Sequence, residues 1–152
     1  MNQLEKWHRN GVIRLSMCWT AQAEASTGHG RRRSQKAWGY TAPLPLITTR
    51  GERDFLDKIS VILFGRRPKS AAEERDCLIV FTAKKYFAVL ITNDGGSKTQ
   101  PRGILGSRDD LARLGVTVMR DWEAVDRVRL LIQRRDQEAR WAAERFALPL
   151  PN

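Results

Sequence analysis

Apolar residues recur along this chain at two spacings, one typical of helices and one typical of strands. Within residues 52–64 they recur at intervals of three and four, which places them on one face of a helix. The same spacing predicts helices over residues 4–8, 21–26, 31–40, 71–86 and 122–147, with a short one between Ser107 and Gly115. The expected apolar stripe of the final helix begins with Trp122, Val125, Val128, Leu131 and Ile132.

Short apolar runs between these helices predict strands at residues 12–18, 43–49, 87–91 and 116–119. Strands that alternate with helices are typical of a mostly parallel sheet with helices on both faces. The expected fold is therefore α/β, a three-layer α/β/α arrangement in one domain over residues 1–147. Residues 148–152 contain two prolines and are expected to form a nonhelical C-terminal tail.

The end of the third predicted strand carries the first candidate site residue. The apolar run of residues 87–91 stops at Thr92 and Asn93, and Asp94 follows directly before two glycines. This order places the Asp94 carboxylate at the carboxyl edge of the sheet, where open α/β sheets build their sites. The alternative is structural, because Asn-Asp-Gly is also a common turn sequence.

The helix before this strand carries a second acid. Asp76, Ile79, Val80 and Ala83 share one helical face, so Asp76 is expected on the buried side of that helix. A buried carboxylate is costly unless a positive group pairs with it, and a divalent cation would serve. The alternative is that Asp76 is a carboxylate near the helix start, where the helix dipole favours it.

A third acid, Glu24, follows the first predicted strand and is expected at the same edge of the sheet. Three carboxylates around one cleft form the oxygen-rich site that Mg²⁺ or Mn²⁺ prefers. Such ions generate a hydroxide nucleophile and neutralise charge on a phosphoryl oxygen. The alternative for Glu24 is an exposed helical glutamate.

Net charge points to a polyanionic partner. The chain carries 27 Lys and Arg against 17 acidic residues, a formal charge of +10, and nucleic acid is the first partner such a charge indicates. Local basic clusters lie at residues 31–33, 66–69, 84–85 and 134–135. Lys98, Arg102 and Arg108 follow the Asp94 strand and are expected to hold phosphates, with plain surface charge as the alternative.

Other classes of protein and site fit the sequence less well. No apolar run approaches the roughly 20 residues that cross a bilayer, and no signal peptide is visible, so a cytoplasmic protein without membrane contact is expected. Cys18 and Cys77 lie in apolar stretches and are expected to be free thiols. His8 and His29 are the two histidines, and no cysteine cluster adjoins them, which argues against zinc.

Three features together resemble a known family. The helix pattern Asp76-x-x-Ile-x-x-x-Ala83, the strand end Val-Leu-Ile-Thr-Asn-Asp94 and the position of Glu24 resemble the PIN domain, the nuclease fold of many toxin–antitoxin toxins. The resemblance extends from about Val12 to Val128. It implies a parallel sheet between helices and Mg²⁺- or Mn²⁺-dependent cleavage of RNA. Glu24, Asp76 and Asp94 would then be the catalytic and metal-binding acids.

The chain departs from this family at its start. PIN domains open with a central strand that ends in an aspartate, whereas residues 4–8 look like the helix after that strand. The first aspartate is therefore absent from the pattern, and one metal ligand is lost with it. One hypothesis is that Met1 is an internal start and the protein begins upstream. The others are a degenerate family member and a second chain that donates the missing strand.

The sequence therefore leads to a ranked set of hypotheses. The first is a metal-dependent ribonuclease of PIN-like type that hydrolyses RNA phosphodiesters. The alternative is a non-catalytic nucleic-acid-binding or regulatory module that keeps the fold and the charge. A third is an interaction protein, either bound by a protein inhibitor or a homodimer whose long final helix packs on another chain.

Overall fold

Helices dominate the computed structural model, which describes residues 2–27, 35, 39–40, 47, 49–95 and 102–146. The elements, in chain order, are α1 (Gln3–Arg9), α2 (Trp19–Thr27), α4 (Arg50–Phe64), α5 (Ala71–Lys85), β1 (Leu90–Ile91), α6 (Gly103–Gly106), α7 (Arg108–Arg113), β2 (Val118–Met119) and α8 (Asp121–Phe146). The helices predicted around residues 4–8, 21–26, 52–64, 71–86 and 122–147 are confirmed.

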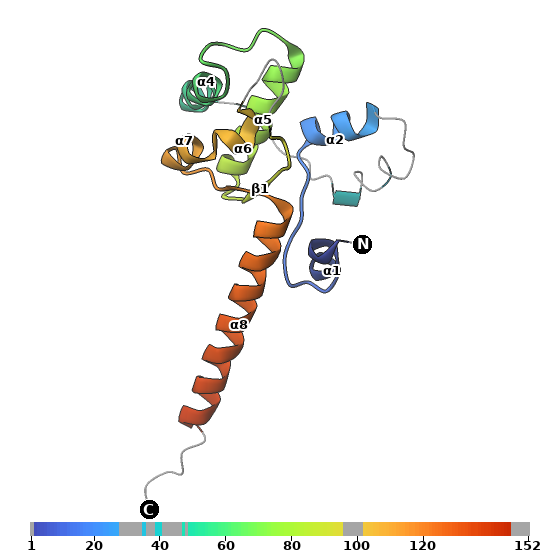
Figure 1. The fold of residues 1–152 in the computed structure, drawn as a ribbon, viewed down its shortest axis with the longest axis vertical. Coiled ribbons are helices and arrows are strands. Elements are labelled where there is room, and N and C mark those ends of the chain that lie inside the picture. The colour runs from blue at the N-terminus through green and yellow to red at the C-terminus, as the bar shows by residue number, and fades with distance from the viewer. Residues whose placement is uncertain are drawn as a thin grey trace, which may run out of the picture.

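The elements fall into a body and a long projection. The body consists of α4, α5, α6 and α7 around the two short strands (Figure 1). α2 packs against α5, and α1 contacts α8. From the strand β2 the helix α8 then leads away from the body as a single long rod (Figure 1).

Local sequence explains where α4 and α5 begin and end. Thr49 caps α4 in a capping box with Glu52, in which each side chain accepts the other residue's backbone N–H at 3.1 Å. Gly65 ends α4 with a left-handed φ of 68°. Ser70 caps α5 by accepting the N–H of Glu73. Such caps each contribute about 1 kcal/mol to the stability of a helix.

The core lies between α4 and α5 and extends to the strands. Ile59 of α4 and Cys77 and Val80 of α5 are fully buried. Leu111 and Val116 continue the same apolar cluster toward β2. Removing this apolar surface from water is the main favourable contribution to folding, so the α4–α5 pair organises the body.

The predicted three-layer fold with a mostly parallel sheet is wrong. The described residues form a two-stranded sheet in which β1 and β2 run parallel, with Leu90 opposite Val118 and Ile91 opposite Met119. The sheet is too small to be covered on both faces by layers of helices. The described chain is instead a mostly helical arrangement in which helices pack on helices.

Two predicted strands show why the apolar runs misled. Residues 12–18 form no strand in the structure; Val12 is exposed, and Met17 donates its N–H to the carbonyl of Tyr40. Of residues 87–91, only the last two form a strand, because Phe87 and Ala88 complete the end of α5. An apolar run becomes a strand only where another strand is available to pair with it.

Several expectations lie wholly or mostly outside the described residues. These are the helix over residues 31–40, the strand over residues 43–49, the side chains of Glu24 and Lys98, and the tail at residues 148–152.

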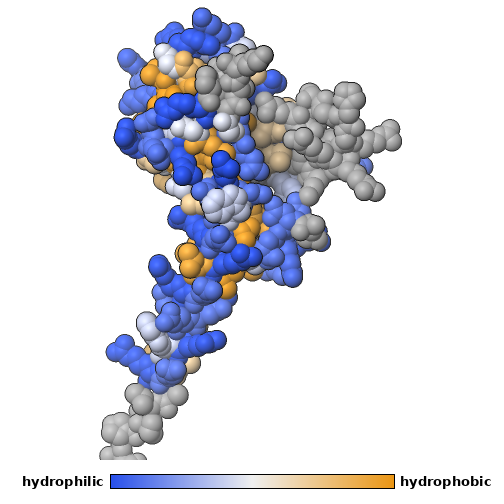
Figure 2. All heavy atoms as spheres, in the orientation of Figure 1, coloured by the Kyte–Doolittle hydropathy of each residue, from blue (hydrophilic) through white to orange (hydrophobic). Residues whose placement is uncertain are grey.

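The apolar stripe of α8 is shorter than expected. Ala124 is buried and Val125, Val128 and Ile132 are half-buried, whereas Trp122 and Leu131 are more than half exposed. Figure 2 shows apolar surface over the first half of α8 and hydrophilic residues over much of the rest. In the described chain, no helix combines the length and the apolar character that a membrane span requires.

Candidate functional site

Asp94 lies where the sequence places it, three residues beyond β1, and the structure gives its carboxylate a role in the fold. Its Oδ2 accepts the backbone N–H of Ile104 at 3.0 Å, and its carbonyl accepts the N–H of Leu105 at 3.1 Å. The hydroxyl of Thr92 accepts the N–H of Asp94. Asp94 therefore fixes the start of the short helix α6 against the end of β1, as a turn residue would.

Asp76 lies at the rim of the buried face of α5 rather than at its centre. The buried face is formed by Glu73, Cys77, Val80 and Phe81, and Asp76 beside it is half-buried. Asp76 takes part in an interaction within the fold. Burial, and then the charge of Asp76, raise the pKa of the Cys77 thiol to about 12. Cys77 is therefore a protonated core residue, and both cysteines are free as expected.

Glu24 lies on α2, and α2 packs against α5, the helix of Asp76. Two of the three elements that carry the predicted acids therefore adjoin. Within the described ranges, however, no group of three or more His, Cys, Asp or Glu side chains comes together in a way that could hold a metal ion. The side chain of Glu24 lies outside the described residues, so the predicted site of three carboxylates stays a prediction.

Arg102 and Arg108 form internal bonds rather than an open phosphate site. The Arg102 guanidinium donates to the carbonyl of Gly106 and, at 3.1 Å, to the carboxylate of Asp110. Arg108 pairs with Glu123 at 3.0 Å, which fastens α7 to the start of α8. The backbone N–H of Arg120 and this pairing hold the pKa of Glu123 below its usual value. Phosphate would have to displace these bonds.

The basic loop between α4 and α5 contains an ion pair that sequence reasoning missed. Arg66 donates two hydrogen bonds to Glu73, at 2.8 and 2.9 Å, and its guanidinium lies 6.0 Å from the ring centre of Phe64. The N–H of Lys69 donates to the same carboxylate at 2.7 Å. These bonds, with that of Arg66 the largest cause, lower the pKa of Glu73 to about 2.

We call the bonds of Arg66 and Lys69 to Glu73 the clamp, and the sequence contains a signal for it. Ser70-Ala-Ala-Glu73 matches the capping-box pattern, which places Glu73 beside the residues that precede the helix. Arg66 lies seven residues before Glu73, and the short loop between α4 and α5 brings its guanidinium to the Glu73 carboxylate. Arg66 is therefore a structural cation, whereas Arg67 is 86% exposed.

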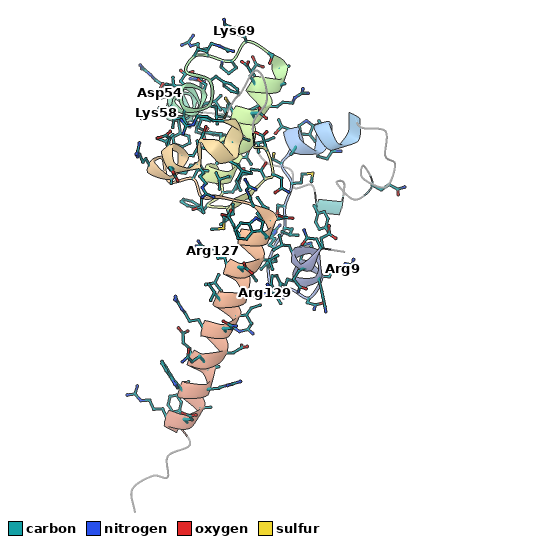
Figure 3. The ribbon with its side chains drawn as sticks, in the orientation of Figure 1. Arg9, Asp54, Lys58, Lys69, Arg127 and Arg129 are labelled. Carbon is teal, nitrogen blue, oxygen red and sulfur yellow. The ribbon has the colours of Figure 1, made fainter. Side chains whose placement is uncertain are left out.

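Further cations lie at the two ends of the α4–α5 pair. Lys85 of α5 pairs with Glu52 of α4 at 2.6 Å, so the end of α5 and the start of α4 lie side by side. Arg50 and Arg53, in the first turn of α4, are exposed and have no ion pair in the described part of the chain. Figure 3 shows Lys69 extending outward from the loop at the other end of this helix pair. Both ends of the α4–α5 pair thus present positive charge.

Charge is distributed unevenly between the body side of the chain and α8. The α8 sequence contains six arginines and six acidic residues, so the helix is neutral overall. The whole formal charge of +10 therefore belongs to the residues outside α8, and the body, residues 49–95 and 102–120, contributes +4 of it. A field of this kind attracts polyanions to the rest of the molecule in preference to the projecting helix.

Comparisons with known proteins add no assignment. No protein-family model, no curated protein and no solved structure matches this chain. The PIN resemblance therefore rests on its short sequence motifs.

Proposed function

We propose that this protein binds single-stranded RNA through its body and that binding, rather than cleavage, is its activity. The observation that carries the proposal is the location of the charge: α8 is neutral, whereas the body, residues 49–95 and 102–120, has 13 Lys and Arg against 9 acidic residues, and exposed arginines stand at the start of α4. Cations of this kind neutralise phosphates and release the counterions that surround a nucleic acid.

Binding is favoured over metal-dependent cleavage by the bonds of the candidate site residues. Asp94 uses a carboxylate oxygen to start α6, and Arg102 and Arg108 are engaged with Asp110 and Glu123. A ribonuclease centre with Glu24, Asp76 and Asp94 around Mg²⁺ or Mn²⁺ stays the rival hypothesis. In that hypothesis the Asp94 carboxylate would have to bind the cation while it also accepts the N–H of Ile104.

Salt dependence tests the binding proposal. A fluorescent 12-nucleotide single-stranded RNA is titrated with the protein at several salt concentrations between 50 and 200 mM, and the slope of log Kd against log salt is measured. The pair R50Q and R53Q should weaken binding and flatten the slope by about 0.7 for each phosphate that the protein no longer neutralises. The matched pair R134Q and R140Q removes the same charge from α8 and should leave the slope unchanged.

The outcomes are distinct. Equal effects of the two double variants would contradict an RNA surface on the body, and no binding of the RNA by the wild-type protein would overturn the proposal itself. Circular dichroism melts of both variants serve as the folding control.

The same RNA separates binding from cleavage. Incubation with Mn²⁺ should leave the RNA intact, with EDTA and Asp94→Asn as controls. The asparagine keeps an oxygen that can accept the Ile104 N–H, so α6 is expected to form in the variant. Cleavage that needs Mn²⁺ and is lost in Asp94→Asn would establish the ribonuclease hypothesis instead.

A further inference from the structure

Phe87 is held in an unusual conformation at the end of α5. Its φ is 53°, and among the described residues it is the one non-glycine residue with a positive φ. Its side chain is also 93% exposed. A bulky L-residue in the left-handed region is strained, and an exposed phenyl ring gains nothing from burial.

The backbone at this position forms a helix-ending Schellman motif. The N–H of Phe87 donates to the carbonyl of Lys84 at 3.1 Å, and the N–H of Ala88 donates to the carbonyl of Ala83 at 2.9 Å. In this motif the residue at the position of Phe87 is usually glycine, because glycine has no Cβ to strain. The two hydrogen bonds fix the backbone at Phe87, so the exposed ring is attached to a rigid part of the chain.

The neighbours of Phe87 are exposed or positively charged. Every residue from 86 to 89 is exposed, and Tyr86 adds a second aromatic ring at 38% exposure. The Lys84 ammonium lies against the backbone of Gly115, just beyond α7, so closely that a Cβ at Gly115 would be 2.5 Å from it. Arg113, in the last turn of α7, has a side chain that is 80% exposed, but its guanidinium pairs with the Asp110 carboxylate at 3.0 Å.

These contacts place Phe87 at a corner where α5 and α7 both end. Lys84 contacts Gly115, and the N–H of Leu90 donates to the carbonyl of Thr117, so the chain on both sides of Phe87 adjoins residues 115–117. The corner therefore combines exposed rings with the cation Lys84. Aromatic rings beside cations are the usual components of surfaces that bind single-stranded nucleic acids.

We propose that Phe87 is a stacking platform for an unpaired base of single-stranded nucleic acid, with Lys84 near it for a phosphate. This inference rests on the proposed binding of single-stranded RNA and names the residue on which a base stacks. The positive charge of Lys84, between the exposed rings and Gly115, favours a polyanion over an apolar protein segment as the occupant. Stacking also requires an unpaired base, because a duplex keeps its base faces covered.

The test compares two oligonucleotides with equal phosphate charge. One is a 12-nucleotide oligouridylate, and the other is the same length with abasic sites throughout. Wild-type protein should bind the oligouridylate more tightly, by roughly 5- to 150-fold for one stacked base. Phe87→Leu, which keeps an apolar side chain without a ring, should remove that preference and leave the affinity for the abasic strand unchanged.

Two further variants separate stacking from a structural role. Phe87→Trp keeps an aromatic face and should retain the preference for bases. Phe87→Gly removes both the ring and the left-handed strain, so it should raise the melting temperature while it lowers the affinity for oligouridylate. A residue kept only for the fold would not show this opposition.

Failure of this inference differs from failure of the proposed function. If wild type and Phe87→Leu bind both oligonucleotides with the same affinity, RNA binding stands and the stacking platform is overturned. The stacking platform is also overturned if Phe87→Leu lowers the affinity for the abasic strand as much as the affinity for the oligouridylate. If the wild-type protein binds neither strand, the proposed function fails and the inference fails with it.

Discussion

Glu73 shows at the scale of one residue how a basic segment can serve the fold. Three donors, two from Arg66 and one from the backbone of Lys69, converge on a carboxylate whose residue is 8% exposed. The loop sequence Arg66-Arg67-Pro68-Lys69 would predict a phosphate ligand only if no acidic side chain of the protein could pair with its cations. Glu73 is within reach, so Arg66 closes the loop between α4 and α5.

The clamp predicts a pH-dependent difference in stability. The folded-state pKa of Glu73 is about 2, below its ordinary value of 4.5, so its contribution is complete above about pH 4.5. That contribution is lost as the pH falls toward 2. Glu73→Gln should therefore lower the free energy of unfolding at neutral pH, and the gap from wild type should close in acid. Urea unfolding at several pH values measures the gap.

Glu74→Gln is the matched control for this prediction. Glu74 is the exposed neighbour in the same first turn of α5, so its removal should change stability little at any pH. A gap for Glu73→Gln that persists unchanged at pH 2 would contradict a stabilising role for the ionised clamp.

At the scale of elements, helices were predicted well, whereas of the predicted strands the described structure keeps only the last two residues of 87–91 and of 116–119. Intervals of three and four depend on the residues of one segment, so α4, α5 and α8 follow from local sequence. A strand depends on a partner elsewhere in the chain, and in the described structure the run at residues 12–18 is joined to a distant segment only by the backbone bond from Met17 to Tyr40. Phe87 was assigned to a strand because it begins an apolar run. In the structure, the backbone N–H groups of Phe87 and Ala88 instead bond to carbonyls of α5 and end that helix.

The outer half of α8 should behave differently from the helices of the body. Every residue from Gln133 to Phe146 is exposed, and a single helix of this length is marginal in water without packing. Brief treatment with trypsin should therefore cut at Arg134, Arg135, Arg140 or Arg145 before it cuts within α4 or α5. Intact-mass measurement over time identifies the order of the cuts.

A variant makes the same prediction sharper. With R134Q and R135Q together, the first cuts in α8 should move to Arg140 and Arg145, while the body fragments keep their rates. Earlier cleavage at Arg53 of α4 than anywhere in α8 would contradict an unsupported outer half.

At the scale of the whole molecule, the sequence predicted a polyanionic partner but not the surface for it. The charge count of +10 was available from composition, whereas its separation from α8 depended on knowing the bounds of that helix. The expected phosphate ligands Arg102 and Arg108 form bonds to acids eight and fifteen residues further along the chain. The sequence alone does not show which acids lie near which cations.

The projection of α8 also changes how fast the protein moves through solution. At 1.5 Å per residue its 26 residues span about 39 Å, similar to the roughly 35 Å width of a compact body of this size. Such a shape experiences more friction than a sphere of the same 17.4 kDa mass. A monomer should therefore leave a gel-filtration column early, at a volume that imitates the homodimer, while light scattering on the same peak reports the mass of one chain.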